Sequence, residues 1–306
     1  MVTGRLATAR TAGPLLTACL LVATSLASGC SVGAAPDSLA PVAGQPDQPF
    51  KVSTIELPYR TCGKPQKIGR TIYATVSRGV DQGDSLIRYD LDSGSTETLV
   101  EAADLIGWFV VNDDWLVWSE HMELFALPVQ GGERQLISNS RDLYAPDIDG
   151  DLLAWDDLSD ERTHRIVLKD LRSGETTKLA DLELADLYNN FPTWGDGRLV
   201  WTDVIDGNGH YFVYDRRTGT TAQHTLTEEE FKYPGYAEMS GDRIYSLNFD
   251  RVDEWDWTIQ QLGYFSEKDN RFVPIVDDDF MVSSFRVSDE YVAVIDSEHA
   301  LAFQRT

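Results

Sequence analysis

The chain carries a nine-residue pattern in three close copies, and this repeat constrains the fold more than any other feature. Each copy begins with turn-forming residues, continues as an apolar run and ends on a carboxylate. The close copies are NDDWLVWSE (Asn112–Glu120), DGDLLAWDD (Asp149–Asp157) and GDGRLVWTD (Gly195–Asp203), and weaker copies are IGRTIYATV (Ile68–Val76), SGDRIYSLN (Ser240–Asn248) and SDEYVAVID (Ser288–Asp296). Self-similarity at a nearly constant period indicates a repeated structural unit, present here six times.

Each unit also contains a second turn, clearest in YDLDSGSTETL (Tyr89–Leu99), KDLRSGETTKL (Lys169–Leu179) and YDRRTGTTAQH (Tyr214–His224). Glycine supplies the positive φ that tight hairpins require, and the flanking β-branched and aromatic residues are typical of strands. Four short strands per unit at this period are typical of a β-propeller blade. The sequence therefore predicts an all-β, six-bladed β-propeller of four-stranded antiparallel blades over residues 50–306. Trp118, Trp155 and Trp201 occupy equivalent positions, where we expect them to fill the space between blades.

The two ends of the repeat predict how the propeller closes. The last unit stops at ALAFQRT (Ala300–Thr306), a third strand, whereas FKVSTIEL (Phe50–Leu57) is a strand that precedes the first complete unit. If the N-terminal strand completes the last blade, the ring closes and leaves no sheet edge open. We therefore expect Phe50–Leu57 to pair with the last blade.

The succession of hydrophobic strand, acid, polar loop and Y-D-L-x-S/T-G resembles the TolB-like six-bladed propellers of bacterial envelopes. The resemblance spans about residues 64–300 and rests on short, degenerate repeats. It implies the propeller architecture. It assigns no function, because such repeats occur in propellers with many unrelated roles.

The N-terminal segment predicts export. Arg5 and Arg10 precede an apolar run, Leu15–Ala27, that is shorter than the roughly 20 residues a membrane-spanning helix needs. The following LASGC resembles the lipobox of bacterial lipoproteins, which implies that Cys30 is lipidated, for example with palmitate. We accordingly expect a signal peptide at 1–29, a flexible Pro/Ala/Gly-rich tether at 30–49, and a protein anchored on the extracytoplasmic side of the cell membrane. An ordinary secretory signal that happens to contain a cysteine is the alternative.

The charge limits the partners. The formal net charge is −24, which argues against nucleic acid, because binding of nucleic acid depends on Lys and Arg contacts to phosphates. We expect a monomeric propeller whose contact with the membrane runs through the lipid on Cys30, and whose partner is an envelope protein or a basic or cationic ligand. Only Cys62 would remain unmodified after processing, so no internal disulfide is expected.

The candidate site residues come from the loops that emerge on one face of a propeller. The nonapeptide ends on Glu120, Asp157, Asp203, Asn248 and Asp296. One interpretation is that each side chain accepts hydrogen bonds from the backbone of its own loop; the other is a carboxylate-lined rim that holds a cation or a basic partner. Asp206, Tyr144 and Tyr188 belong to loops on the same face and complete the proposed partner face.

No familiar enzyme motif occurs in the chain, and the five histidines lack metal-ligand spacing. The sequence therefore favours a lipid-anchored binding or scaffold protein with no cofactor and no catalytic activity of its own. Two alternatives stay open. One is a propeller hydrolase or lactonase that uses a divalent cation such as Ca²⁺, and the other is an accessory lipoprotein of a membrane sensor or transporter.

Overall fold

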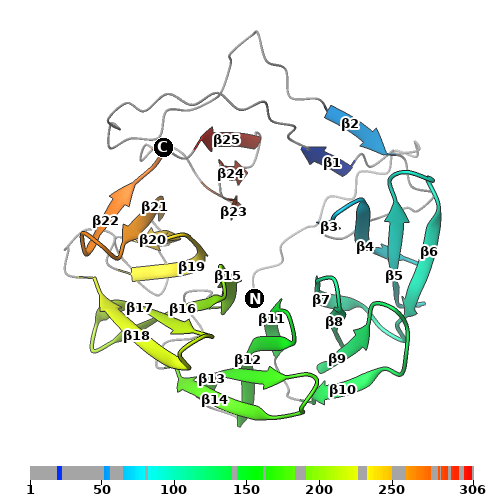
Figure 1. Ribbon diagram of the computed structural model, residues 1–306, viewed down its shortest axis with the longest axis horizontal. Coiled ribbons are helices and arrows are strands. Elements are labelled where there is room, and N and C mark those ends of the chain that lie inside the picture. Colours follow the sequence, from blue (N-terminus) through cyan, green and yellow to red (C-terminus); the bar gives the residue numbers. More distant parts are fainter. Residues whose placement is uncertain are drawn as a thin grey trace, which may run out of the picture. The chain divides into compact units, whose positions relative to one another are not determined.

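The computed structural model describes residues 19–22, 52–55, 65–79, 82–139, 143–160, 163–182, 191–226, 233–249, 260–276, 282, 284–288, 291–295 and 300–304. Every regular element in these ranges is a β-strand (Figure 1). The chain forms two compact units. The first contains Met1–Ala27 and Phe50–Glu101, and the second contains Ser28–Pro49 and Ala102–Thr306.

The first unit holds two antiparallel sheets. A two-stranded sheet joins β1 (Cys19–Val22) to β2 (Val52–Ile55). The other sheet, which we call the first sheet, has the order β3-β4-β5-β6, with bounds Gln66–Ile68, Thr71–Ser77, Asp84–Asp90 and Thr96–Glu101.

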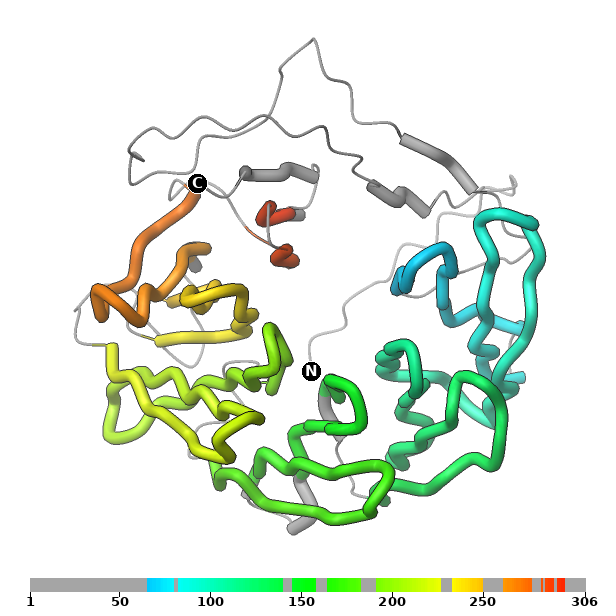
Figure 2. Tube along the Cα trace, in the orientation of Figure 1, coloured from blue at the N-terminus to red at the C-terminus, as the bar shows by residue number. Residues whose placement is uncertain are grey.

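The second unit holds five antiparallel sheets, each with its strands in chain order (Figure 2). The second sheet is β7 to β10 (Ile106–Val111, Trp115–Glu120, Glu123–Pro128, Gln135–Ser138), and the third is β11 to β14 (Leu143–Asp149, Leu152–Asp160, Thr163–Asp170, Thr176–Asp181). The fourth is β15 to β18 (Thr193–Gly195, Arg198–Ile205, Asn208–Asp215, Thr220–Thr225), and the fifth is β19 to β22 (Tyr233–Ser240, Arg243–Phe249, Gln260–Ser266, Arg271–Pro274). The sixth sheet has three strands in the described ranges, β23 to β25 (Ser284–Val287, Tyr291–Ile295, Ala300–Gln304).

The six sheets follow the six sequence repeats. The nonapeptide supplies the second strand of every sheet, namely β4, β8, β12, β16, β20 and β24. Its seventh residue is buried in all six sheets, at Ala74, Trp118, Trp155, Trp201, Ser246 and Val294. The predicted all-β architecture of antiparallel, four-stranded sheets is confirmed at this level.

The predicted closure by Phe50–Leu57 is not shown by the described residues. Within that segment, β2 pairs with β1 in a continuous register from Val52 opposite Val22 to Ile55 opposite Cys19. The physical reason is that an unpaired strand offers its hydrogen-bonding groups to any extended apolar segment within reach. The segment CLLV of β1 meets this requirement, and it belongs to the residues that the sequence assigns to the signal peptide.

The recurrent Y-D-x-x-S/T-G turn has a common local cause. In the turn between β13 and β14, Asp170 Oδ1 accepts hydrogen bonds from the backbone N–H groups of Arg172 at 2.9 Å and Ser173 at 2.8 Å. Gly174 follows with φ 78°, which a residue with a side chain adopts at a cost. Asp90 and Asp215 make the same contacts in their turns, so the aspartate and the glycine of the repeat are there to form the hairpin.

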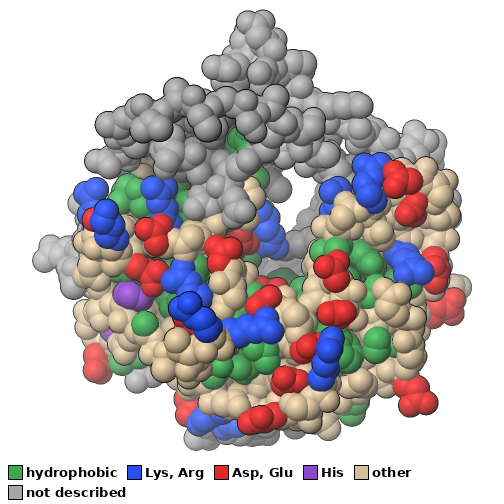
Figure 3. Space-filling view, in the orientation of Figure 1, with side chains coloured by type: hydrophobic (Ala, Val, Ile, Leu, Met, Phe, Trp, Pro, Cys, Tyr) green, Lys and Arg blue, Asp and Glu red, His purple; other side chains and the backbone are tan. Residues whose placement is uncertain are grey.

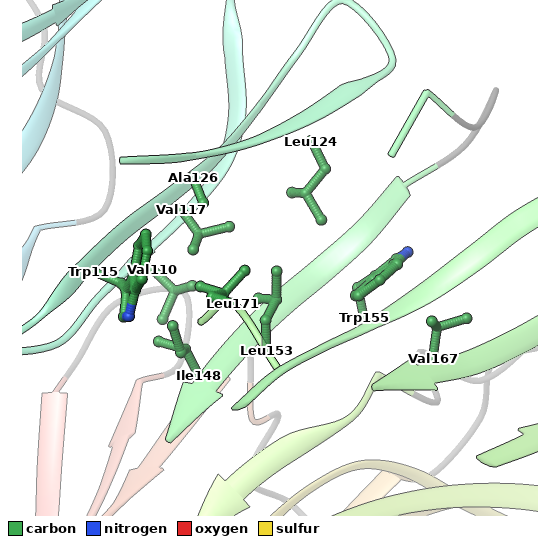
Figure 4. Packing of buried hydrophobic residues seen from close by; sticks show 10 residues of the cluster. All are labelled: Val110, Trp115, Val117, Leu124, Ala126, Ile148, Leu153, Trp155, Val167 and Leu171. Carbon is green, nitrogen blue, oxygen red and sulfur yellow. The ribbon is translucent and has the colours of Figure 1, made fainter. Parts of the chain in front are cut away.

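Two of the three tryptophans belong to buried clusters that join consecutive sheets, as the sequence predicts. Trp155 of β12 shares one cluster with Val117 and Leu124 of the second sheet (Figure 4). Trp201 of β16 packs in the same way on Ala154 and other residues of the third sheet. The core of the second unit is thus a series of similar apolar layers between consecutive sheets, each stabilised by burial of large side chains.

The first strands of these sheets lie next to one another: β7 beside β11, β11 beside β15, β15 beside β19, and β19 beside β23. Figure 1 shows each of them at the inner end of its sheet. Gly195 makes the approach of β15 to β19 possible, because a Cβ at this position would overlap the backbone carbonyl of Met239. This close approach brings side chains from different sheets together at the inner edge.

Candidate functional site

The residues that end the nonapeptides lie in the interior. Glu120, Asp157, Asp203 and Asn248 close or nearly close their second strands, and their side chains are 5%, 8%, 2% and 0% exposed. Burial of this degree requires partners for the polar atoms. Asp296, Tyr188 and Cys30 lie outside the described residues, as does the side chain of Tyr144, whose backbone belongs to β11.

Two of these side chains have well-defined structural contacts. Glu120 accepts hydrogen bonds from the backbone N–H of Ala103 at 2.5 Å and from Arg134 Nη1 at 3.2 Å. Asn248 Oδ1 accepts from the Tyr211 hydroxyl at 2.9 Å and from Ser246 Oγ at 2.6 Å. Neither set of contacts is to the backbone of the residue's own hairpin loop, which one interpretation expected; both bind the side chain to other parts of the structure. A role in a partner face stays a prediction.

The remaining predicted residues differ in burial and in hydrogen bonding. Asp203 Oδ1 accepts from the backbone N–H of Val204 at 2.8 Å. Asp157 Oδ1 is buried and has no hydrogen-bond partner in the described ranges. Asp206 is exposed at the tip of the β16–β17 hairpin, with φ 52°. Of the predicted residues whose side chains the structure describes, Asp206 is therefore the one placed at the surface.

A second series of equivalent residues lies on the first strands, each opposite the sixth residue of a nonapeptide. Pairing in the ladders fixes the equivalence, and the members in the second unit are Val110, Asp147, Thr193, Glu238 and Arg286. Three of the five are ionisable, although they stand on strands that pack against one another. We call this series the inner-edge position.

Carboxylates at the inner-edge position bind the backbone of the next sheet. Asp147 Oδ2 accepts from the N–H of Trp194 at 2.6 Å, and Glu238 Oε2 accepts from the N–H of Val287 at 2.7 Å. Each first strand is the edge of its own sheet, so some of its N–H groups have no partner within the sheet. The two carboxylates supply those partners and connect consecutive sheets.

Arg286 behaves differently from the other members. Its Nη1 donates to Glu238 Oε1 and to the Tyr236 hydroxyl, and that hydroxyl donates to the same Glu238 oxygen at 2.6 Å. The Arg286 side chain is nevertheless 69% exposed, whereas that of Glu238 is 13% exposed. With Asp147, these three residues form what we call the inner-edge cluster.

Burial and charge together shift the protonation of this cluster. Burial raises the pKa of Asp147 to about 6, against two backbone N–H groups that act to lower it. Nearby Glu238 raises that pKa further, and Arg286 opposes this. Desolvation is the largest single influence on Arg286 and acts to lower its pKa. Glu238 and Tyr236, through their charges and hydrogen bonds, together outweigh it and raise the pKa, so the guanidinium stays cationic.

Sequence reasoning missed the inner-edge cluster. The repeat is recognisable in the second strands, whereas the first strands share no motif. Aligning them through the ladder would have placed Asp147, Glu238 and Arg286 at one position, where Val110 and Thr193 show that charge is not needed for pairing.

Two kinds of feature are absent from the described residues. Within those ranges no group of three or more His, Cys, Asp or Glu side chains is placed to hold a metal ion. The same ranges contain no helix that is long and apolar enough to cross a membrane.

No protein-family model and no curated protein matches this chain. Among solved structures, the β-propeller domain of the trilobed protease from Pyrococcus furiosus aligns with a TM-score of 0.60 at 11% identity, over 79% of this chain and 81% of that one. The tricorn protease aligns with a TM-score of 0.59 at 15% identity, over 79% of this chain but only 29% of the other. These two likenesses show that the chain has a β-propeller fold, and at such identities they show the fold alone. TolB from Acinetobacter baumannii is a weaker match, with a TM-score of 0.47 at 13% identity over 78% of this chain and 64% of TolB.

Proposed function

We propose that the protein is a lipid-anchored binding module on the extracytoplasmic side of the cell membrane. The signal-like N-terminus and the LASGC sequence support the anchor. The observation that carries the binding role is Arg286, which is fixed by Glu238 and Tyr236 and yet is 69% exposed at the inner edge of the propeller.

The contacts that hold the Arg286 guanidinium in position leave part of it able to bind a partner. Both contacts of Arg286 use Nη1, so in the described structure Nε and Nη2 make no hydrogen bond. These two groups form a planar fork that can donate two parallel hydrogen bonds to a carboxylate or phosphate. Because Glu238 and Tyr236 already restrict the side chain, a partner that binds there loses less conformational entropy on association.

The inner edge and the loop face offer complementary chemistry. The cluster contains two carboxylates and one guanidinium, and exposed Asp206 adds an acid on a loop. A partner that combines an anionic group for Arg286 with basic residues for the acids fits both. Such a mixture is typical of a protein surface, so we propose an envelope protein as the partner.

The test is crosslinking in intact membranes followed by purification of the anchored protein. Wild type should capture a defined partner, and Arg286→Ala should reduce the capture at least about tenfold, in keeping with loss of a charged hydrogen-bonding anchor. Arg286→Lys should restore part of it, because lysine keeps the charge without the fork. Arg172→Ala is the matched control, since Arg172 is 66% exposed and paired with Asp151 elsewhere in the same unit. Equal capture by wild type and Arg286→Ala would show that the inner edge is not the binding site.

A hydrolase that depends on a divalent cation is the second candidate. Both structures that show the fold come from proteases by name. Asp157 Oδ1, which is buried and has no hydrogen-bond partner among the described residues, is the kind of oxygen that Ca²⁺ binds. A site of this type would stabilise the folded protein by a few kcal/mol at saturating metal. A melting temperature that is the same in Ca²⁺ and in chelator would remove this candidate and leave the binding role.

A further inference from the structure

The hairpin turn between β8 and β9 has an unusual composition. Glu120 pairs with Glu123, so His121 and Met122 are its two central residues, and their φ angles are 50° and 65°. Positive φ at both positions is the requirement of a type I′ turn, for which Asn-Gly and Asp-Gly are the preferred sequences. Histidine tolerates this conformation better than most residues, but methionine has no such advantage.

The equivalent hairpin turn of another sheet in this chain has a preferred type I′ sequence. In the fourth sheet, Ile205 pairs with Asn208, and the two central residues between them are Asp206 and Gly207, with φ 52° and 75°. The same turn is therefore made by Asp-Gly in one sheet and by His-Met in another. A side chain kept in an unfavourable conformation is an indication that it has a role outside the fold.

The His121–Met122 turn is also apolar and exposed. Met122 is 63% exposed, and Leu105, which directly precedes β7, is 68% exposed. His121 Nδ1 and Asp104 Oδ2 are 3.0 Å apart, which ties the turn to the segment that carries Leu105. Ile106 pairs with Glu120, so Leu105 and Met122 flank the same end of the β7–β8 ladder.

The charges around the turn favour a basic partner. Asp104, Glu123 and Glu120 all act on His121 and raise its pKa. In the part of the chain that the structure describes, the cations that contact these carboxylates are His121 itself, when protonated, and Arg134, which is paired with Glu120. Within those ranges the three carboxylates outnumber the one permanent cation, so the surroundings of the two apolar side chains are acidic.

We propose that Leu105, His121 and Met122 form a docking site for a basic segment of a partner protein that inserts an apolar side chain between them. Methionine suits this role because its flexible, polarisable side chain adapts to different partners, and exposed apolar side chains rimmed by charge are typical of interaction sites. The site deepens the binding function proposed above, and it shares no residue with the inner-edge cluster.

The test uses fluorescein-labelled synthetic decapeptides in which Lys or Arg alternates with Leu or Phe, together with the same peptides carrying Glu in place of the basic residues. Wild type should bind the basic set more tightly than the acidic set. The double variant H121N/M122G, which installs a preferred type I′ sequence, should weaken that binding about tenfold or more. The same variant should raise the melting temperature by about 2–4 °C, because it removes the backbone strain.

Three further variants separate the possible outcomes. Leu105→Ser should weaken binding without the gain in melting temperature. Leu136→Ser should bind as wild type does, because Leu136 is 54% exposed on the outer strand β10 of the same sheet. Equal binding of the basic peptides by wild type and H121N/M122G would overturn the docking site, and so would binding of wild type to phosphatidylglycerol vesicles in preference to the peptides. Arg172→Ala, which lies outside both proposed sites, should bind the peptides normally. The inner-edge proposal is tested by partner capture with Arg286→Ala, so the two proposals can fail independently.

Discussion

Asp147 shows how one residue can connect sheets at a cost in stability. Its side chain accepts backbone N–H groups of Ile148 and Trp194, yet burial raises its pKa to about 6. The desolvation of the charged carboxylate therefore outweighs its two hydrogen bonds. Because the unfolded chain has an ordinary aspartate pKa near 3.8, the folded state binds the Asp147 proton more tightly than the unfolded state does.

This difference predicts a pH dependence of stability. The contribution of Asp147 is fully favourable below about pH 4 and is lost as the pH rises through about 6, with an amplitude of about 3 kcal/mol. The Asp147→Asn variant should lose this component, so its free energy of unfolding should fall less than that of wild type between pH 4.5 and 7. Urea denaturation of both proteins at several pH values measures the effect. Parallel profiles would show that Asp147 does not titrate in this range.

At the scale of the strand, the first strands depend on close backbone approach. Gly195 has an extended backbone, so its lack of a side chain matters for space, and the atom that a Cβ would meet belongs to the backbone of Met239. A backbone carbonyl cannot rotate away as a side chain can. The contact between β15 and β19 is therefore intolerant of any residue but glycine.

Gly195→Ala should consequently destabilise the protein by about 1–3 kcal/mol or more, as overpacking of a tight contact does. Gly107→Ala is the matched control on β7, because a Cβ there would lie 3.1 Å from the Ser119 hydroxyl oxygen, which belongs to a side chain. We expect the control to cost clearly less. Chemical denaturation of the two variants gives the comparison, and equal losses would contradict the steric explanation.

At the scale of strands and turns, part of the structure was predictable from the sequence. The second strands and the turns were predictable, because Trp155, Trp201 and the Asp170–Gly174 turn belong to repeated patterns with a local physical cause. The pairing of β2 was not, since a short apolar strand carries no signal that selects between partners far apart in the sequence. The inner-edge cluster was missed because its residues meet through inter-sheet packing, and the His121–Met122 turn because it lacks the sequence that normally marks such a turn.

At the scale of the whole molecule, acidic and basic side chains lie near one another, but acidic residues outnumber basic ones. The chain carries 50 acidic and 26 basic residues, and Figure 3 shows both kinds of side chain interspersed over the face that it presents. A strong negative charge keeps such a molecule soluble and disfavours binding to anionic lipid. Attachment to a membrane therefore needs a covalent device, which is the role proposed for Cys30.

Cys30→Ser should release the protein from the membrane fraction into the soluble extracytoplasmic fraction, because no acyl chain would be attached. Labelling with a palmitate analogue should disappear in the same variant. Cys62→Ser serves as the control and should stay both membrane-bound and labelled. Retention of Cys30→Ser in the membrane would contradict lipid anchoring at this residue.

The carboxylate contacts of the inner edge have a direction along the chain. Asp147 accepts from Trp194, and Glu238 accepts from Val287 and Arg286, so each acceptor precedes its donor in the sequence. If the chain is exported as proposed and leaves the translocation machinery N-terminus first, each acceptor is exposed before the donor that completes it. We then expect the sheets of the second unit to be added one after another. Stalled translocation intermediates probed with protease should show this as protected fragments that lengthen in steps.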